Sequence, residues 1–260
     1  MDGRDDANLQ KKYGLIYTCR AGWIDLGHLN PSNPRIEIGA ENLWKQLTHE
    51  GPAIVDAACG PAPFMASGLQ TLAHHLGKPE RCSSDPAYKF PDGKTGFQVV
   101  FRQDHAGYPG KPGCEGRYIV KHGLRDDQKR QIALAIFMEV SHRFESFQSA
   151  LSLVTNSGYS QEDLVSNLIG FYIGIGEIEK LAALRLCHPV SAATAYKIWD
   201  REGAVGANKN TQWQPRYASS TVLIDEQQCR DECALVPKGF PDAFTRLQPA
   251  IKGSHFYELP

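Results

Sequence analysis

The sequence has no long hydrophobic run and no apolar segment near its N-terminus. Its longest largely apolar stretch, Ile132–Val140, is far short of the roughly 20 residues that a membrane-spanning helix needs. Residues 1–12 are mostly polar and charged, without the hydrophobic region of a secretory signal. The sequence therefore predicts no transmembrane segment and no classical signal peptide.

An excess of either charge is also absent. The chain of 260 residues has 28 Lys and Arg against 29 Asp and Glu, which leaves a formal net charge of −1. Because a protein that binds polyanions needs a basic surface, we expect no nucleic-acid partner. Hydrophobic residues make up 42% of the chain and charged residues 22%, proportions that exclude disorder, collagen and coiled coil as classes. A chain of this length can bury a core without metal or disulfide staples.

Cysteine is present but dispersed, which excludes a small disulfide-stapled scaffold. Cys229 and Cys233 are close in sequence and are the best candidates for a disulfide, although free thiols fit the pattern equally well. An odd number of cysteines leaves at least one thiol unpaired in a monomer. The seven cysteines are residues 19, 59, 82, 114, 187, 229 and 233.

Helical periodicity dominates residues 125–186, with one clear break at Asn156–Gly158. After this break, Ser160 followed by Asp163 is a capping arrangement for the next helix. Further elements are predicted from local patterns of apolar and turn-forming residues. They are helices over residues 40–50, 61–77 and 192–200, and strands over residues 96–101 and 117–120 that form a ribbon with a long loop.

These elements predict a mainly α fold, which is α+β with a minor β ribbon, in a single catalytic domain of residues 1–260. Its parts are a mixed α and β-ribbon half, a helical core and a loop-rich C-terminal part. These parts span residues 1–124, 125–200 and 201–260.

Glu139 is the most informative polar position, because it interrupts an apolar helical run. It lies one turn from Ile136 and one turn before His142. Apolar neighbours would desolvate this carboxyl and raise its pKa, which suits a general acid at neutral pH. The alternative is a structural Glu that pairs with Arg143 or with an internal Lys, or that faces solvent.

His142 and Glu145 lie three residues apart on the same predicted helix and match the H-x-x-E spacing of some zinc hydrolases. A zinc site needs a third ligand from a distant segment, and the candidates are Asp25, His28, His49, His74, His75, His105 and His188. The stronger His-Glu-x-x-His signature is absent. We therefore keep zinc as an alternative.

The segment Tyr17–His28 combines aromatic and polar side chains. Trp23 beside Asp25 is typical of a sugar-binding site, because rings stack on the apolar faces of sugars while carboxylates bind hydroxyls. His28 follows three residues later. The alternative is an N-terminal strand that docks on the core with Trp23 buried.

The residues after the helix break supply a second polar group. A short loop between antiparallel helices places Tyr159, Glu162 and Asn167 near the C-terminal half of the preceding helix. These residues are therefore candidate members of a site. Their alternative roles are helix capping and interhelical hydrogen bonding.

Three blocks resemble an uncharacterised family of bacterial envelope domains. Thr18–His28 matches its Thr-Cys-Arg-x-Gly-aromatic-Ile-Asp-x-x-His pattern, Glu139–Ser141 its Glu followed by small polar residues, and Glu162–Gly170 its Glu-Asp-Leu-x-Ser-Asn-x-x-Gly pattern. Members often carry His before that Glu. This chain has Met138 there, which weakens any metal site that would depend on that His.

The chain also resembles the C-terminal lysozyme-like domain of type VI secretion effectors of the TseP kind, which attack peptidoglycan in rival bacteria. This resemblance implies a lysozyme-like cleft and hydrolysis of glycan strands by an essential Glu, a role that we transfer to Glu139. It further implies delivery to the periplasm of target bacteria without a signal peptide, and an immunity protein as partner. The Glu-Ser signature of true lysozymes, followed by a glycine-rich hairpin, is not matched at Glu145-Ser146.

Together these patterns predict a peptidoglycan hydrolase of the lysozyme or muramidase type, without a metal or other cofactor, acting as an antibacterial effector. The catalytic candidates are Glu139 as acid, Asp25 or Glu162 as base or nucleophile, and His142. The substrate-binding candidates are Trp23, His28, Tyr159 and Asn167. The alternatives are a zinc-dependent amidase or peptidase that uses His28, His142 and Glu145, and a non-catalytic glycan-binding module in which Trp23, Trp44 and Trp199 stack on sugars.

Overall fold

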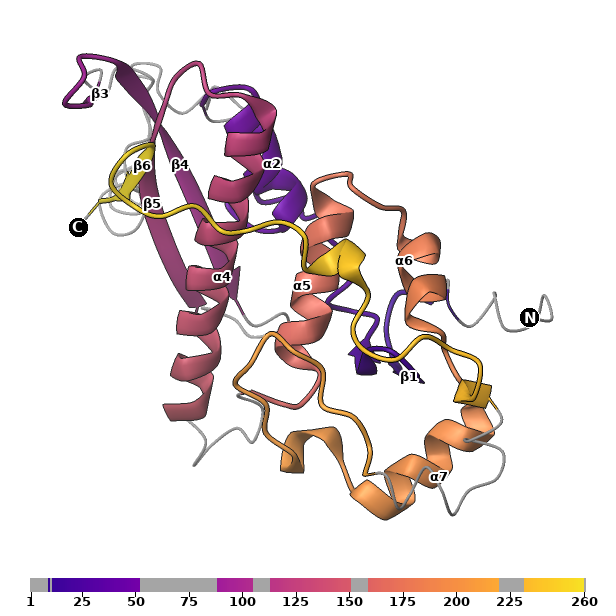
Figure 1. Cartoon of the computed structure of the whole chain (residues 1–260). Helices are drawn as coiled ribbons and strands as arrows, with labels where there is room; N and C mark the ends of the chain where they lie inside the picture. Colours follow the sequence, from indigo (N-terminus) through magenta and orange to yellow (C-terminus); the bar gives the residue numbers. More distant parts are fainter. Residues whose placement is uncertain are drawn as a thin grey trace, which may run out of the picture.

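Helices pack on a four-stranded antiparallel sheet, so the fold is α+β (Figure 1). The computed structural model describes residues 9, 11–51, 88–104, 113–150, 159–219 and 232–259. Its strands are β1 (Leu15–Thr18), β2 (Gly22–Asp25), β3 (Tyr88–Lys89), β4 (Thr95–Asp104), β5 (Gly113–Lys121) and β6 (Phe256–Glu258). Its helices are α2 (Ala40–Thr48), α4 (Asp126–Ala150), α5 (Asp163–Gly174), α6 (Lys180–Cys187), α7 (Ala192–Glu202), η2 (Val205–Ala207) and η3 (Asp242–Phe244).

The predicted ribbon exists as the β4–β5 pair, but it is part of a larger sheet with the order β3-β4-β5-β6. Cross-strand neighbours such as Phe97 and Val120, or Val99 and Tyr118, place large side chains on one face. These side chains are buried against helix α4 in the main core. The sheet exceeds the prediction because β6 comes from the far end of the chain, where local periodicity gives no signal.

Helix α2 covers the part of β4 that has no strand partner beyond β3. The side-chain amide of Gln46 accepts from the Val100 N–H over 2.9 Å and donates to the Val100 carbonyl over 3.0 Å. Further along, the Arg102 N–H donates to the Glu37 carbonyl. These bonds satisfy backbone groups that an exposed edge strand would leave open to pairing with another chain.

Helix α4 begins at Asp126 and packs lengthwise on the sheet (Figure 1). Ile132, Ile136 and Val140 recur one turn apart and are fully buried. Phe137 lies with its ring centroid 5.8 Å from that of Phe101 on β4. The predictions of helices near 40–50 and 192–200 are likewise confirmed, by α2 and α7.

The prediction of one helix running from the Asn156–Gly158 break to residue 186 is wrong, because α5 ends at Gly174 and α6 begins at Lys180. Gly176 takes a left-handed backbone conformation with φ 75°. Its N–H donates to the Ile173 carbonyl, and the Glu177 N–H donates to the Tyr172 carbonyl. This pair of bonds is the Schellman motif, which ends helices at a glycine.

Glycines on α5 let the N-terminal segment approach closely. A β-carbon on Gly170 would lie only 2.3 Å from the His28 carbonyl oxygen, and one on Gly174 only 2.6 Å from the Ala40 β-carbon. Any other residue at position 170 would therefore push the two segments apart. This contact fixes His28, and Asp25 before it, beside the first turns of α5.

Strands β1 and β2 form a hairpin that docks on the core, and Trp23 on β2 is only 5% exposed. The Trp23 ring makes edge contacts with Tyr17 and with Trp199 of α7, with ring centroids 5.4 and 5.6 Å apart. This is the docked strand that the sequence left open as an alternative. A sugar-stacking role needs an exposed ring face, so burial assigns Trp23 to packing.

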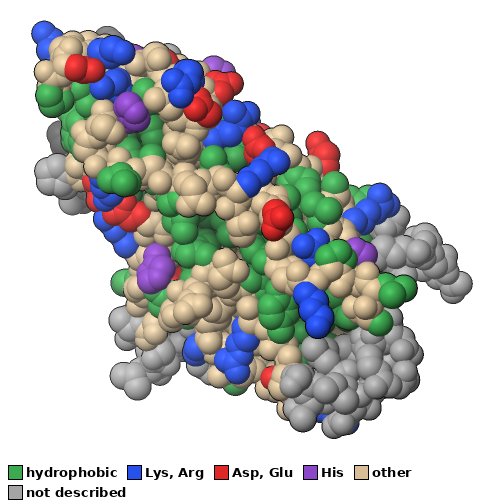
Figure 2. Space-filling model, in the orientation of Figure 1, with side chains coloured by type: hydrophobic (Ala, Val, Ile, Leu, Met, Phe, Trp, Pro, Cys, Tyr) green, Lys and Arg blue, Asp and Glu red, His purple; other side chains and the backbone are tan. Residues whose placement is uncertain are grey.

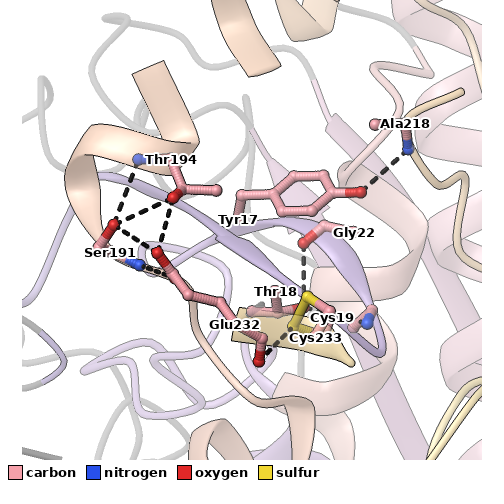
Figure 3. The surroundings of a disulfide bond; sticks show 10 residues. Tyr17, Thr18, Cys19, Gly22, Ser191, Thr194, Ala218, Glu232 and Cys233 are labelled. Carbon is pink, nitrogen blue, oxygen red and sulfur yellow. Dashed lines mark hydrogen bonds between the residues drawn. A yellow bond between two sulfur atoms is a disulfide. The ribbon is translucent and has the colours of Figure 1, made fainter. Parts of the chain in front are cut away.

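A disulfide joins Cys19, in the turn between β1 and β2, to Cys233 (Figure 3). The pairing of Cys233 with Cys229 is therefore wrong, and Cys229 lies outside the described residues. Next to the bond, the Glu232 carboxylate accepts hydrogen bonds from the Ser191 N–H and the Thr194 hydroxyl at the start of α7. Spacing along the sequence cannot reveal a pair whose members are 214 residues apart.

From the disulfide, the last described segment runs back past α5 and α4 to β6 at the sheet (Figure 1). The Ala250 N–H donates to the Gln131 carbonyl of α4, and the Leu247 N–H donates to the Tyr172 hydroxyl of α5. The face in Figure 2 shows acidic and basic side chains interspersed over the end of the molecule that holds the sheet. Within the described ranges, no helix has the length and apolarity to span a membrane. The predicted helix over residues 61–77 lies outside the described residues.

We expect loss of the disulfide to lower the free energy of unfolding by about 2–5 kcal/mol, because the bond closes a loop that costs entropy only in the unfolded chain. Urea unfolding of the double variant Cys19→Ser, Cys233→Ser measures this difference. The control is Cys114→Ser, which changes a half-buried free thiol and should cost little. Equal midpoints for the double variant and the wild type would contradict the prediction.

Candidate active site

Five titratable side chains from three parts of the chain meet at the start of α5. Asp25 ends β2, His28 follows in the next turn, Glu145 lies on α4, and Glu162 and Asp163 begin α5. We call these residues the acidic cluster. The contact between α5 and the backbone of residue 28 brings the first two to the last two.

Two of the buried carboxyls of the cluster, Glu145 and Asp163, are held by backbone donors. The Ser160 N–H donates to Asp163 Oδ2 over 2.8 Å, and the Tyr159 N–H donates to Glu145 Oε2 over 2.9 Å. The carboxyls of Glu145 and Asp163 lie close enough to influence each other's pKa. The N-cap of α5 is Glu162 and has no side-chain cap, so the capping arrangement predicted for Ser160 and Asp163 exists only as this bond from the Ser160 N–H to Asp163.

Tyr159 links the start of α5 to helix α4. Its backbone is left-handed, with φ 55°, which costs a non-glycine residue on the order of 1 kcal/mol. Its hydroxyl lies 2.9 Å from His142 Nδ1 and 2.6 Å from Ser146 Oγ. The prediction that Tyr159 lies near the C-terminal half of the preceding helix is confirmed.

Asp25 and His28 form the half-buried side of the acidic cluster. His28 Nδ1 lies 3.6 Å from Asp25 Oδ2 and 3.9 Å from Asp163 Oδ1. The Gly27 N–H donates to Asp25 Oδ1 over 2.8 Å, and the Asp25 N–H donates to Ser166 Oγ over 2.9 Å. These bonds fix the Asp25 carboxylate in a position that solvent can reach.

Burial raises the pKa of three carboxyls in the cluster. It raises the pKa of Glu162 to about 6, of Glu145 to about 7 and of Asp163 to about 8. Desolvation is the largest cause in each case, because it disfavours the charged form, and neighbouring carboxylates add to it. The positive charge of His28 opposes the shift at Glu145 and Glu162. The cluster therefore holds protons near neutral pH.

Glu162 combines a raised pKa with an unpaired oxygen. The residue is 6% exposed, and its Oε2 is buried without a hydrogen-bond partner among the described residues. Glu145 is even more buried, with 2% exposed, and its Oε2 is used by Tyr159. Glu162 is thus the better placed of the two to pass a proton to another molecule.

Asn167 lies one turn after Asp163 on α5 and pairs with Gln103 near the end of β4. Gln103 Nε2 donates to Asn167 Oδ1 over 3.3 Å. Asn167 is among the predicted site residues, but Gln103 is not, because a single polar residue at the end of a strand does not indicate a site. Asp163 is predicted only as a capping residue, although its side chain also approaches His28.

Glu139 does not have the apolar surroundings expected from its helical neighbours. It pairs with Arg143 and with Lys252, and Lys252 Nζ lies 2.6 Å from Glu139 Oε1. Both cations also bind Glu258 of β6. The alternative of a structural Glu paired with Arg143 is therefore the one found. The helical periodicity around Glu139 predicted apolar surroundings wrongly, because Lys252 and Glu258 reach this position from the C-terminal segment.

In the described part of the chain, no group of three or more His, Cys, Asp or Glu side chains is arranged to hold a metal ion, as the zinc alternative would require. The His142 ring instead hydrogen-bonds to Tyr159. His28 approaches Asp25 and Asp163. His28, His142 and Glu145 thus do not form a metal site in this arrangement.

Comparisons of the chain with known protein families, with curated proteins and with solved structures find no match. The chemistry of the acidic cluster is therefore inferred from its own geometry.

We expect the buried carboxyls to make the protein less stable as the pH rises from about 5 to about 8. A carboxyl with a higher pKa in the folded chain binds its proton more tightly there, so its contribution is complete below its unfolded pKa, near 4, and declines as the pH rises to the folded value. Replacing Asp163, with a pKa of about 8, by Asn keeps an acceptor for Ser160 and should reduce the decline by at least about 1 kcal/mol.

Urea unfolding at several pH values measures this effect. The matched control is Asp127→Asn on the exposed first turn of α4, where Arg125 lowers the pKa of the carboxyl and its titration is complete below pH 5. Parallel pH curves for the wild type and Asp163→Asn would contradict the expected linkage.

Proposed function

We propose that the chain is a peptidoglycan glycan-strand hydrolase of the lysozyme or muramidase type, with the acidic cluster as its catalytic centre. The single observation that carries this proposal is the buried carboxyl of Glu162, with a pKa raised to about 6 and an unpaired oxygen, beside the half-buried carboxylate of Asp25. Glycosidases need such a pair, with one carboxyl that gives a proton and one that stays ionised.

In this proposal Glu162 protonates the glycosidic oxygen, so that the bond to the leaving sugar breaks as the proton is transferred. Asp25 is the second carboxylate and acts as base toward water or as nucleophile at the sugar carbon. His28 lies 3.6 Å from Asp25 and orients its carboxylate. The acid role moves from Glu139 to Glu162, because Arg143 and Lys252 already occupy the Glu139 carboxylate.

Glu145 and Asp163 have a supporting role in the proposal. They are neighbours of Glu162, and the negative charge of each carboxyl that loses its proton disfavours ionisation of its neighbours. Both are anchored by backbone N–H groups, so neither has to move during a reaction. The negative charge of either carboxyl therefore makes ionisation of Glu162 less favourable.

The identity of the substrate rests on the resemblance of the chain to the C-terminal lysozyme-like domain of type VI secretion effectors of the TseP kind. That resemblance also implies an antibacterial effector delivered to the periplasm of target bacteria, with an immunity protein as partner. The Cys19–Cys233 disulfide supports an oxidising destination, since such bonds persist outside the reducing cytosol.

We expect the purified protein to release new reducing sugar ends from peptidoglycan, and Glu162→Gln to lower the rate by at least about 100-fold through loss of the proton donor. Glu139→Gln, a matched change at an ion-paired Glu of α4, should keep most of the rate. Muropeptide mass analysis and a reducing-end assay measure both variants, each with and without EDTA.

Each other result would reject part of the proposal. Loss of activity in Glu139→Gln but not in Glu162→Gln would return the acid role to Glu139. Freed peptides that disappear with EDTA would favour the zinc amidase or peptidase. Binding to peptidoglycan without any product would favour a glycan-binding module.

A further inference from the structure

The Cys19–Cys233 disulfide lies in the wall of an open cavity. Both cysteines line this cavity and both are half-buried, so the bond is not enclosed in the core. The cavity has a volume of about 280 Å³, several times the roughly 30 Å³ that one water molecule takes in the liquid. A molecule of a few heavy atoms therefore fits against the disulfide.

The rest of the cavity wall is largely apolar and carries a positive charge. The rings of Tyr17 and Tyr217 line it together with Val236 and Pro237. Lys238 is the one charged side chain among the described residues that line it. Such a wall suits a small ligand that combines a short hydrocarbon part with a negative charge.

A second cation lies behind this wall, and the acidic side chain beside the disulfide is already used. Arg20 Nε donates over 3.0 Å to the carbonyl of Gly239, which lines the cavity. The carboxylate of Glu232 instead accepts from the Ser191 N–H over 2.6 Å and from the Thr194 hydroxyl over 2.7 Å, at the start of α7 (Figure 3). The N-terminus of a helix compensates a negative charge, so the cavity keeps a positive potential.

We propose that the Cys19–Cys233 bond is a site of thiol–disulfide exchange, which small anionic thiols open through this cavity while the protein stays folded. The thiolate attacks one sulfur atom, the bond between the two cysteines breaks as a mixed disulfide forms, and the other cysteine leaves as a thiolate that takes a proton from water. A second small thiolate attacks the small-thiol sulfur of the mixed disulfide. The two cysteines are then reduced to thiols, and the two small thiols are oxidised to their disulfide.

The folded chain can hold the reduced form. Cys19 Sγ lies 3.9 Å from the Glu232 carbonyl oxygen, which is an acceptor for the S–H once the bond is open. The turn keeps its backbone bonds, because the Cys19 N–H donates to the His188 carbonyl and the Arg20 N–H donates to the Cys187 carbonyl. Exchange thus makes the covalent link between the hairpin and the C-terminal segment depend on the thiols of the compartment. This inference does not depend on the proposed function.

The test measures reduction of the folded protein by three thiols of similar size, 2-mercaptoethanesulfonate, 2-mercaptoethanol and cysteamine, which are anionic, neutral and cationic. Alkylation and peptide mass mapping of Cys19 and Cys233 give each rate constant, which is divided by that of the same thiol with a small neutral disulfide. We expect rates proportional to thiol concentration. After the division, the anionic thiol should be at least about 3-fold faster than the cationic one.

Three variants test the route through the cavity. Lys238→Glu should remove the preference for the anionic thiol, because it replaces a positive charge at the wall by a negative one. Lys94→Glu, the same change at an exposed position before β4, is the matched control and should keep the preference. Val236→Phe fills part of the cavity and should slow all three thiols by at least about 5-fold, since exchange depends on access. Urea midpoints like that of the wild type show that each variant is folded.

A reduction rate that reaches the same plateau with all three thiols would overturn the inference, because opening of the fold and not entry of the thiol would then limit the reaction. Equal rate constants for the three thiols after the division would overturn it as well. The same holds for a preference that Lys238→Glu leaves unchanged, and for a Val236→Phe variant that is reduced as fast as the wild type.

Discussion

The close contact between helix α5 and the backbone of residue 28 is the constraint on which the site depends. Gly170 has no side chain, so the carbonyl of His28 can lie where a β-carbon would otherwise be. The contact joins a hairpin near the N-terminus to the first turns of a helix more than a hundred residues later. Asp25 and His28 thereby meet Asp163, and Ser166 receives the backbone N–H of Asp25.

Bringing these segments together removes three carboxyls from water. Desolvation raises the pKa of Glu162, Glu145 and Asp163, and repulsion between neighbouring buried carboxylates raises it further. Such an arrangement lowers stability at neutral pH, because the folded chain must retain protons that the unfolded chain releases. Proteins usually accept that cost where the same protons serve chemistry.

Much of the candidate site could be predicted from local composition, since Asp25, His28, Tyr159, Glu162 and Asn167 all lie in two polar segments that the fold brings together. Partners from distant segments could not be predicted. Neighbours on its own helix made Glu139 look buried in apolar surroundings, but Lys252 and Glu258 arrive from the C-terminal segment. The Cys19–Cys233 disulfide could not be predicted either, because its two cysteines are far apart in the sequence. The contact of Gln103 with Asn167 could not be predicted because no local pattern marks Gln103. Helix α5 ends at Gly174 because Gly176 takes a left-handed conformation, and this glycine is a local signal in the sequence for the end of the helix.

The central claim is that the acidic cluster holds protons near neutral pH, and carbon-13 NMR titration of the carboxyl carbons tests it most directly. With assignments from Glu162→Gln, Glu145→Gln and Asp163→Asn, we predict midpoints of about 6 for Glu162, about 7 for Glu145 and about 8 for Asp163. The pKa of exposed carboxyls such as Asp127, which Arg125 lowers, should lie below the ordinary range. Midpoints near 4 for all three buried carboxyls would contradict the account, because a cluster that is fully ionised at pH 7 has no proton to donate.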